Sequence, residues 1–135
     1  MKKLFKKALN SQKGFTLIEL LAVIVILAIV AAIAVPAIGN IIQNQRDKAV
    51  LADASTIIAG AKLAFADGAC ASETVCLGTE INDYVEGVPS LVATDTVTVA
   101  DWSIVWTGFT EIASDSKFSV PAAGISETAL LELMD

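Results

Sequence analysis

An unbroken apolar run near the N-terminus constrains this chain more than any other feature. Residues 20–38 are nineteen consecutive apolar residues, Pro36 among them, and no charged residue occurs over residues 20–45. As an α-helix, such a run spans roughly 29 Å at about 1.5 Å per residue, which matches a bilayer core of about 30 Å. A soluble protein of 135 residues is too short to cover this helix on all sides, so a buried soluble helix is the weaker alternative. The run predicts a single membrane-spanning helix.

The charges on the two sides of this run differ strongly. From Phe15 onward four bases face fifteen acids, a formal charge of −11, although the whole chain carries only −6. The positive-inside rule then places the N-terminus in the cytoplasm and the acidic body outside. An acidic body lacks the basic face that nucleic acids require, and we expect no direct nucleic-acid binding. The remaining five bases all precede Gly14: Lys2, Lys3, Lys6, Lys7 and Lys13.

Two residues are unexpected in a plain membrane anchor. Glu19 stands directly before the run, where an ionised carboxylate at the edge of the hydrocarbon is costly and is often functional. The alternative is that Glu19 lies at the level of the headgroups and costs little. Pro36 removes a backbone donor and is expected to kink or weaken the helix, although membrane helices also tolerate proline.

The segment around Glu19 resembles the processing site of the type IV pilins and pseudopilins, the class III signal sequence. The shared features are a basic leader, Gly14, Phe15, a glutamate four residues later and the uninterrupted apolar run. Pro36 also falls where these pilins usually carry a helix-kinking proline. The resemblance extends over about residues 1–65 and implies the pilin fold, a long helix packed on a small antiparallel sheet.

The resemblance implies that a prepilin peptidase cuts between Gly14 and Phe15 and then methylates the new amine of Phe15. Gly14 has no side chain, so an extended backbone can enter a narrow protease cleft. The positive amine, in a filament that of a neighbouring subunit, can pair with Glu19 and make its carboxylate tolerable. Glu19 is therefore expected to direct assembly, and Pro36 to mark where the helix loosens to fit the filament.

The function implied is that of a structural subunit, processed and assembled with copies of itself into a pilus or pilus-like filament. Its expected partners are the prepilin peptidase, an assembly ATPase, an inner-membrane platform protein and, before assembly, membrane lipid. The subunit would first span the cell membrane once and later stand outside the cell in a surface filament. Adhesion or motility, DNA uptake in competence, and type II secretion all use such filaments, and the sequence leaves the choice open.

Two other interpretations remain open. A secretory signal peptide cut after Ala34 would fit the basic start and the small residues near that position, and it would leave Val35 as the mature N-terminus. The alternative function is a single-pass membrane-anchored extracellular binding module that does not polymerise. Such an anchor has no need of Gly14, Phe15 or Glu19, which favours the filament subunit.

After the run, the pattern predicts an amphipathic continuation of the helix. Apolar residues recur at spacings of three and four along one face, and Asp67-Gly68 is a typical helix end. We expect the charged residues of this segment to lie mostly in solvent. The apolar face comprises Val50, Ala54, Ile57, Ile58, Ala61 and Phe65, and the charged residues are Arg46, Asp47, Lys48, Asp53 and Lys62.

The rest of the chain predicts a small α+β head. Residues 96–99 and 103–106 have the composition and alternation of strands, and 109–112 and 117–120 are weaker strand candidates. A helical turn is expected near 81–85, and Ser126 should cap a final helix over 127–133. The expected organisation is a leader over 1–14, the membrane and filament-core part of the helix over 15–38, its amphipathic part over 39–67, and the head over 68–135.

Cys70 and Cys76 are predicted to form a structural disulfide, as expected outside the cytoplasm. The alternative, half of a metal site, has no histidine and no further cysteine to complete it.

No enzymatic site is predicted. Without histidine the chain lacks the commonest general base, and no catalytic constellation, cofactor motif or metal site is recognisable. Carboxylates in the head loops could bind calcium, as in certain secretion pseudopilins, but they lack calcium-loop spacing and are expected to be solvated surface charges. They are Asp95, Asp101, Glu111 and Asp115.

Overall fold

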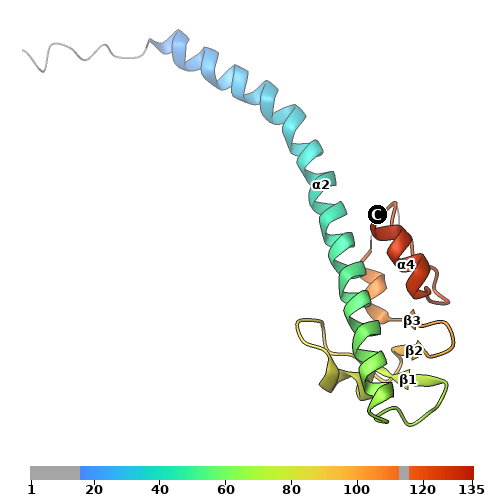
Figure 1. The fold of residues 1–135 in the computed structure, drawn as a ribbon. Coiled ribbons are helices and arrows are strands. Elements are labelled where there is room, and N and C mark those ends of the chain that lie inside the picture. The colour runs from blue at the N-terminus through green and yellow to red at the C-terminus, as the bar shows by residue number, and fades with distance from the viewer. Residues whose placement is uncertain (1–15, 113–115) are drawn as a thin grey trace, which may run out of the picture. The chain divides into compact units, whose positions relative to one another are not determined.

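A computed structural model describes residues 16–112 and 116–135 of the chain. The N-terminal half is one long helix, α2 (Leu17–Ala66), and the C-terminal half is a small mixed head (Figure 1). The chain divides into two compact units, Met1–Asn40 and Ile41–Asp135. The elements after α2 are β1 (Val75–Leu77), α3 (Gly78–Ile81), η1 (Asn82–Tyr84), β2 (Thr96–Thr98), β3 (Ser103–Val105), η2 (Thr107–Glu111) and α4 (Glu127–Met134).

Helix α2 ends where the sequence predicts. Gly68 adopts a φ of 72°, a left-handed conformation that glycine takes without steric cost. This turn lets the Ala69 N–H donate to the Ala64 carbonyl at 2.8 Å and the Gly68 N–H donate to the Phe65 carbonyl at 3.1 Å. The bonds satisfy carbonyls that would otherwise lack partners at the helix end. Pro36 lies inside α2, and helix is assigned on both sides of it.

The sheet of the head has three antiparallel strands in the order β1-β2-β3. Its register places Cys76 opposite Val97 and Val97 opposite Ile104. An isolated bridge between Ile104 and Ile125 extends this row beyond β3. All four side chains are at most 6% exposed and belong to the same apolar core as the inner face of α2. The sheet is therefore stabilised by packing on the helix, as expected for so few strands.

The core contributed by α2 follows the predicted spacing of three and four, with two corrections. Leu51, Ala54, Ile57, Ile58 and Ala61 are at most 1% exposed. Phe65, which was expected on this face, is instead 36% exposed and contacts Trp102 edge-to-face at 6.2 Å between ring centroids. Asp47 was expected in solvent, yet it is 1% exposed. Its Oδ1 accepts a hydrogen bond from Gln43 Nε2 at 2.8 Å, which lowers the cost of burying the carboxylate.

The α+β fold, a long helix packed on a small antiparallel sheet, is confirmed, but the elements of the head are only partly those predicted. Strands β2 and β3 and helix α4 lie where expected, and the predicted turn near 81–85 corresponds to α3 and η1. The predicted strand over 109–112 is wrong, because Thr107–Glu111 forms the 3-10 helix η2. The predicted strand over 117–120 is also wrong, since Phe118 enters the core from a segment without strand pairing. Strand β1 was not predicted.

Candidate assembly site

The start of α2 is closed by a reciprocal pair of side chains, Thr16 and Glu19. The Thr16 N–H and its hydroxyl each donate to Glu19 Oε2 at 2.8 Å, and the Glu19 N–H donates to Thr16 Oγ1 at 3.3 Å. This is a capping box, which satisfies backbone donors at the first turn of a helix. The carboxylate predicted to direct assembly is thus already hydrogen-bonded within its own chain. Thr16 was missed in the sequence, although the Thr-x-x-Glu spacing of Thr16 and Glu19 is a recognised signal for such a cap.

The apolar run forms a surface that the described part of the chain does not cover. Every large apolar side chain from Leu17 to Ile38 is between 48% and 82% exposed. An 18-residue window of α2 has a mean hydropathy of 3.1 and is 0% buried. By length and composition, α2 is the one described helix that could cross a membrane. Exposed apolar area of this extent indicates a surface that another apolar phase or protein covers.

The cleavage residues Gly14 and Phe15 lie outside the described residues. Of the predicted processing and assembly set, the structure therefore places Glu19 at the first turn of α2 and Pro36 within the exposed part of the same helix.

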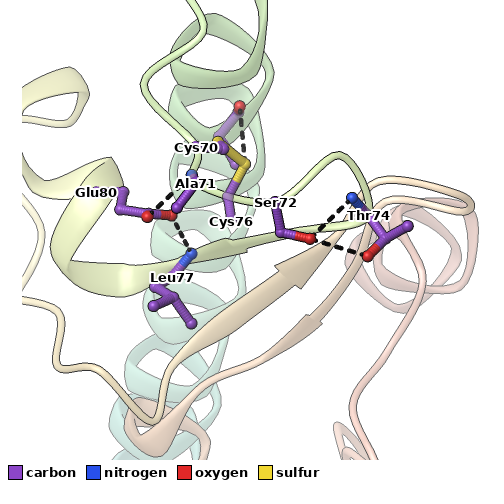
Figure 2. Close-up of a disulfide and its surroundings, with 8 residues drawn as sticks. Cys70, Ala71, Ser72, Thr74, Cys76, Leu77 and Glu80 are labelled. Carbon is purple, nitrogen blue, oxygen red and sulfur yellow. Dashed lines mark hydrogen bonds between the residues drawn. A yellow bond between two sulfur atoms is a disulfide. The ribbon is translucent and has the colours of Figure 1, made fainter.

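The predicted disulfide between Cys70 and Cys76 is present in the structure (Figure 2). Cys76 is fully buried in β1, and its Sγ lies 4.0 Å from the carbonyl of Ala61 on α2. Figure 2 shows Glu80 beside the bridge, where its two carboxylate oxygens accept from the N–H groups of Ala71 at 3.0 Å and Leu77 at 2.9 Å. The disulfide ties the loop that follows α2 to the first strand of the sheet.

Two of the carboxylates considered for calcium, Asp95 and Asp101, instead accept hydrogen bonds from neighbouring residues of the head. Asp95 is 3% exposed and accepts from the Val92 N–H at 2.8 Å and from the N–H and hydroxyl of Thr107 at 2.8 and 2.9 Å. Asp101 accepts from the Ser103 N–H at 3.2 Å in the turn between β2 and β3. Asp115 lies outside the described residues. Among the residues that the structure does describe, no group of three or more His, Cys, Asp or Glu could hold a metal ion.

Two groups in the head have shifted pKa values. Partial burial raises the pKa of Asp53 above its ordinary value, and the negative charge of Glu111 adds to this shift. Burial also raises the pKa of Tyr84, as do the charge of Asp67, the hydrogen bond that Tyr84 donates to it, and the charge of Asp83. In both places, a neighbouring acid adds to the effect of burial.

Comparison with known proteins points to the same N-terminal segment. A sequence model described as the prokaryotic N-terminal methylation motif matches residues 9–35. Fimbrial protein Q of Moraxella bovis is 39% identical over 80 residues, which are 59% of this chain and 48% of that protein. A fimbrial protein of Moraxella nonliquefaciens is 48% identical over 54 residues, 40% of this chain and 32% of that protein.

A third relative, the type IV major fimbrial protein FimA of Dichelobacter nodosus, is 35% identical over 86 residues, 61% of this chain and 55% of that protein. The chain thus spans about half the length, or less, of these curated relatives. No solved structure matches the chain. All three carry the name of a fimbrial protein rather than of an enzyme.

Proposed function

We propose that this chain is a type IV pilin and the subunit of a surface filament, which its N-terminal methylation motif and its similarity to fimbrial proteins support. In this proposal a prepilin peptidase removes residues 1–14, methylates the amine of Phe15, and releases a subunit for assembly by a membrane ATPase and platform protein. The subunit first spans the cell membrane, with its N-terminus in the cytoplasm, and then joins a filament of identical chains outside the cell.

The observation that carries the proposal is the exposed apolar surface of α2 over residues 17–38. A helix that is apolar all round is stable only inside lipid or against other apolar helices. The same surface can serve both states in turn, because the transfer from lipid to neighbouring helices exchanges one apolar environment for another. The subunit can then leave the membrane without exposing this area to water.

Glu19 can fix the register in which neighbouring helices dock, which apolar contacts alone do not specify. In lipid, its carboxylate is held by the capping box with Thr16. In the filament, we propose that the methylated amine of Phe15 of a neighbouring subunit pairs with Glu19. Pairing with a positive charge compensates a carboxylate in a medium of low dielectric far better than neutral donors do. The helices therefore dock in the register that brings these two groups together.

Mass spectrometry of the mature protein tests the processing step. We expect an N-terminus at Phe15 that carries one methyl group on its amine, in protein recovered from cells that produce the prepilin peptidase. Protein from cells without the peptidase should retain residues 1–14. An N-terminus at Val35 would instead identify a secretory signal peptide cut after Ala34 and would overturn the filament proposal.

The filament itself is tested by shearing. We expect the chain in the sheared surface fraction, and gold-labelled antibodies against the head should mark filaments in electron micrographs. We favour a surface fimbria over a DNA-uptake or secretion filament, because the matched relatives are named fimbrial proteins. Correctly processed protein that stays in the membrane fraction under all conditions would favour the anchored binding module.

A further inference from the structure

Two lysines in the head share one aromatic ring. The ammonium nitrogens of Lys117 and Lys48 lie 4.7 and 5.9 Å from the centroid of Phe118, which is itself 2% exposed. Lys48 also donates to the carbonyl of Met134 at 3.3 Å, whereas Lys117 is exposed. A ring face attracts cations, so Phe118 holds both positive charges close together. We call Lys48 and Lys117 the lysine pair.

The lysine pair has no carboxylate partner in the described part of the chain. There, the one ion pair joins Lys62 to Glu127 at 2.6 Å. Glu132 and Asp135, near Met134 at the end of α4, form no ion pair with either lysine. In a chain whose acids outnumber its bases by fifteen to nine, two ammonium groups at one ring with no carboxylate against them among the described residues form a positive site.

The other end of the head is acidic. Asp67, Asp83 and Glu86 are all exposed, and we call these three residues the acidic end. Tyr84 connects two of them, since its hydroxyl donates to Asp67 Oδ2 at 3.2 Å and Asp83 precedes it in the chain; Glu86 follows two residues after Tyr84. No lysine or arginine occurs in residues 63–116. The acidic end therefore lacks a base from its own part of the chain.

The lysine pair and the acidic end cannot meet within one chain. Lys48 lies in α2, and Asp67 directly follows the last residue of that helix. The nineteen residues that separate them in sequence correspond to about 28 Å along a helix axis. Figure 1 shows α4 and the C-terminus at one end of the head, and β1 with the C-terminal end of α2 at the other end.

We propose that in the filament the lysine pair of one subunit binds the acidic end of a second copy of this chain. The inference rests on the proposed filament function and specifies one contact between heads. A patch that fits a different patch on the same molecule makes a heterologous contact, which repeats along a filament without closing. Complementary charges fix the register of such a contact and disfavour wrong ones, while the exposed apolar part of α2 supplies most of the association.

Zero-length cross-linking of intact wild-type filaments tests the contact directly. A carbodiimide joins an amine to a carboxylate only when the two groups touch. About 28 Å separates Lys48 from Asp67 along α2. About 18 Å separates Lys48 from Gly60, against which Tyr84 and Val85 pack between Asp83 and Glu86, so we expect none of these links within one chain. After digestion, mass spectrometry should find Lys117 or Lys48 joined to Asp67, Asp83 or Glu86. Links from these lysines only to other carboxylates, or none at all, would overturn the contact.

Charge exchange gives a second test. Lys117 is chosen because Lys48 also holds the Met134 carbonyl. Lys117→Glu should reduce the sheared filament fraction by up to about fivefold, the upper range for an exposed ion pair. Adding Asp83→Lys to the same chain should restore the fraction. Membrane levels of each variant show whether the protein folds and persists.

Arg46→Glu is the matched control, because Arg46 is also exposed and undergoes the same change of charge. Its filament fraction should fall less than that of Lys117→Glu. An equal fall for both variants, or no restoration in the double variant, would contradict the contact. If wild-type cells yield no filaments of this chain, the proposed function fails; if filaments form without the cross-links, only the contact between heads fails.

Discussion

At the scale of single residues, Glu19 has one observed partner and one proposed partner. Within one chain it caps α2 through Thr16, and in the proposed filament it pairs with the amine of Phe15 from a neighbour. The first role needs only an acceptor, whereas the second needs a negative charge. A substitution that keeps the acceptor and removes the charge separates the two roles.

Glu19→Gln is therefore expected to leave α2 and its processing intact while lowering filament incorporation. The amide oxygen can still accept from the Thr16 N–H, but it cannot form an ion pair with the methylated amine. Incorporation is measured as the ratio of sheared to membrane-bound protein, and processing by N-terminal mass spectrometry. Thr16→Ser keeps both the hydroxyl and Glu19, so it should assemble like the wild type. Normal incorporation of Glu19→Gln would show that the charge has no part in assembly.

Asp53 gives the head a defined dependence on pH. Its folded-state pKa is raised above the ordinary value of 3.8, because burial and Glu111 disfavour the charged form. The folded state thus holds the proton more tightly than the unfolded chain. The stability from this residue is fully present below the ordinary pKa and is lost as the pH rises through the raised pKa.

Asp53→Asn is uncharged at every pH and should remove this dependence. Relative to the wild type, the variant is expected to gain stability as the pH rises from below 3.8 toward neutrality. Denaturant unfolding of the full chain in detergent micelles, followed by tryptophan fluorescence across this range, measures the difference. Glu111→Gln should give part of the same effect, because it removes only the second cause. A difference between Asp53→Asn and wild type that does not change with pH would contradict the assignment.

At the scale of elements, α4 depends on its N-terminal cap and on one ion pair to α2. The Ala129 N–H donates to Ser126 Oγ at 3.4 Å, and Lys62 binds both oxygens of Glu127 at 2.6 and 2.7 Å. Leu130, which is fully buried, then anchors α4 in the core. A helix of eight residues is marginal without such support.

Ser126→Ala should lower the free energy of unfolding by about 1 kcal/mol, the usual cost of losing a side-chain cap. Denaturant unfolding of the full chain in micelles measures this change. Ser90→Ala, at an exposed loop position, is the control and should be close to neutral. Equal stability of Ser126→Ala and wild type would mean that the bond at 3.4 Å contributes little.

The elements that the sequence predicted correctly are those with local signals. The length and periodicity of α2, the β-branched residues of β2 and β3, and the serine before α4 are all readable within a few residues. Strand β1 cannot be recognised from its own residues, because three residues are too few to show alternation. It is defined by its pairing with Thr96–Thr98. The errors over 109–112 and 117–120 have the same origin, since aromatic and β-branched residues serve a 3-10 turn or a core-facing loop equally well.

The candidate site was predictable to a similar degree. The disulfide, expected from the spacing of its cysteines, is present, whereas the assembly roles of Glu19 and Pro36 stay predictions. The burial of Asp47 was not predictable, because it depends on how the head covers α2 rather than on the helix pattern. The lysine pair was not predictable either, since Lys48 and Lys117 are brought together only by the position of Phe118 in the fold.

At the scale of the whole molecule, the proposed processing would change both the charge and the role of the chain. Before cleavage the formal charge is −6, and the segment from Phe15 onward carries four bases and fifteen acids, or −11. The proposed cut would also create the amine that Glu19 is proposed to need. Charge, cleavage and assembly are therefore expected to change together.

Gly14→Leu should block the cleavage, the change of charge and the assembly, because a branched side chain does not fit the narrow cleft proposed for the peptidase. The variant is expected to keep residues 1–14, to stay in the membrane fraction, and to migrate less toward the anode than mature subunit in a native gel with neutral detergent. Gly14→Ala, with the smallest possible side chain, is the control and should be processed at least in part. Filaments built from uncleaved Gly14→Leu would show that assembly does not require the new amine.

The loop after α2 is held closed by two separate sets of interactions, and only one of them is covalent. Besides the disulfide, the Glu80 carboxylate joins the residues that follow each cysteine, Ala71 and Leu77, through two hydrogen bonds (Figure 2). The second closure needs no oxidant. A freshly exported chain is therefore expected to bring its two thiols together before any oxidant acts. Oxidation would then seal a loop that is already in place.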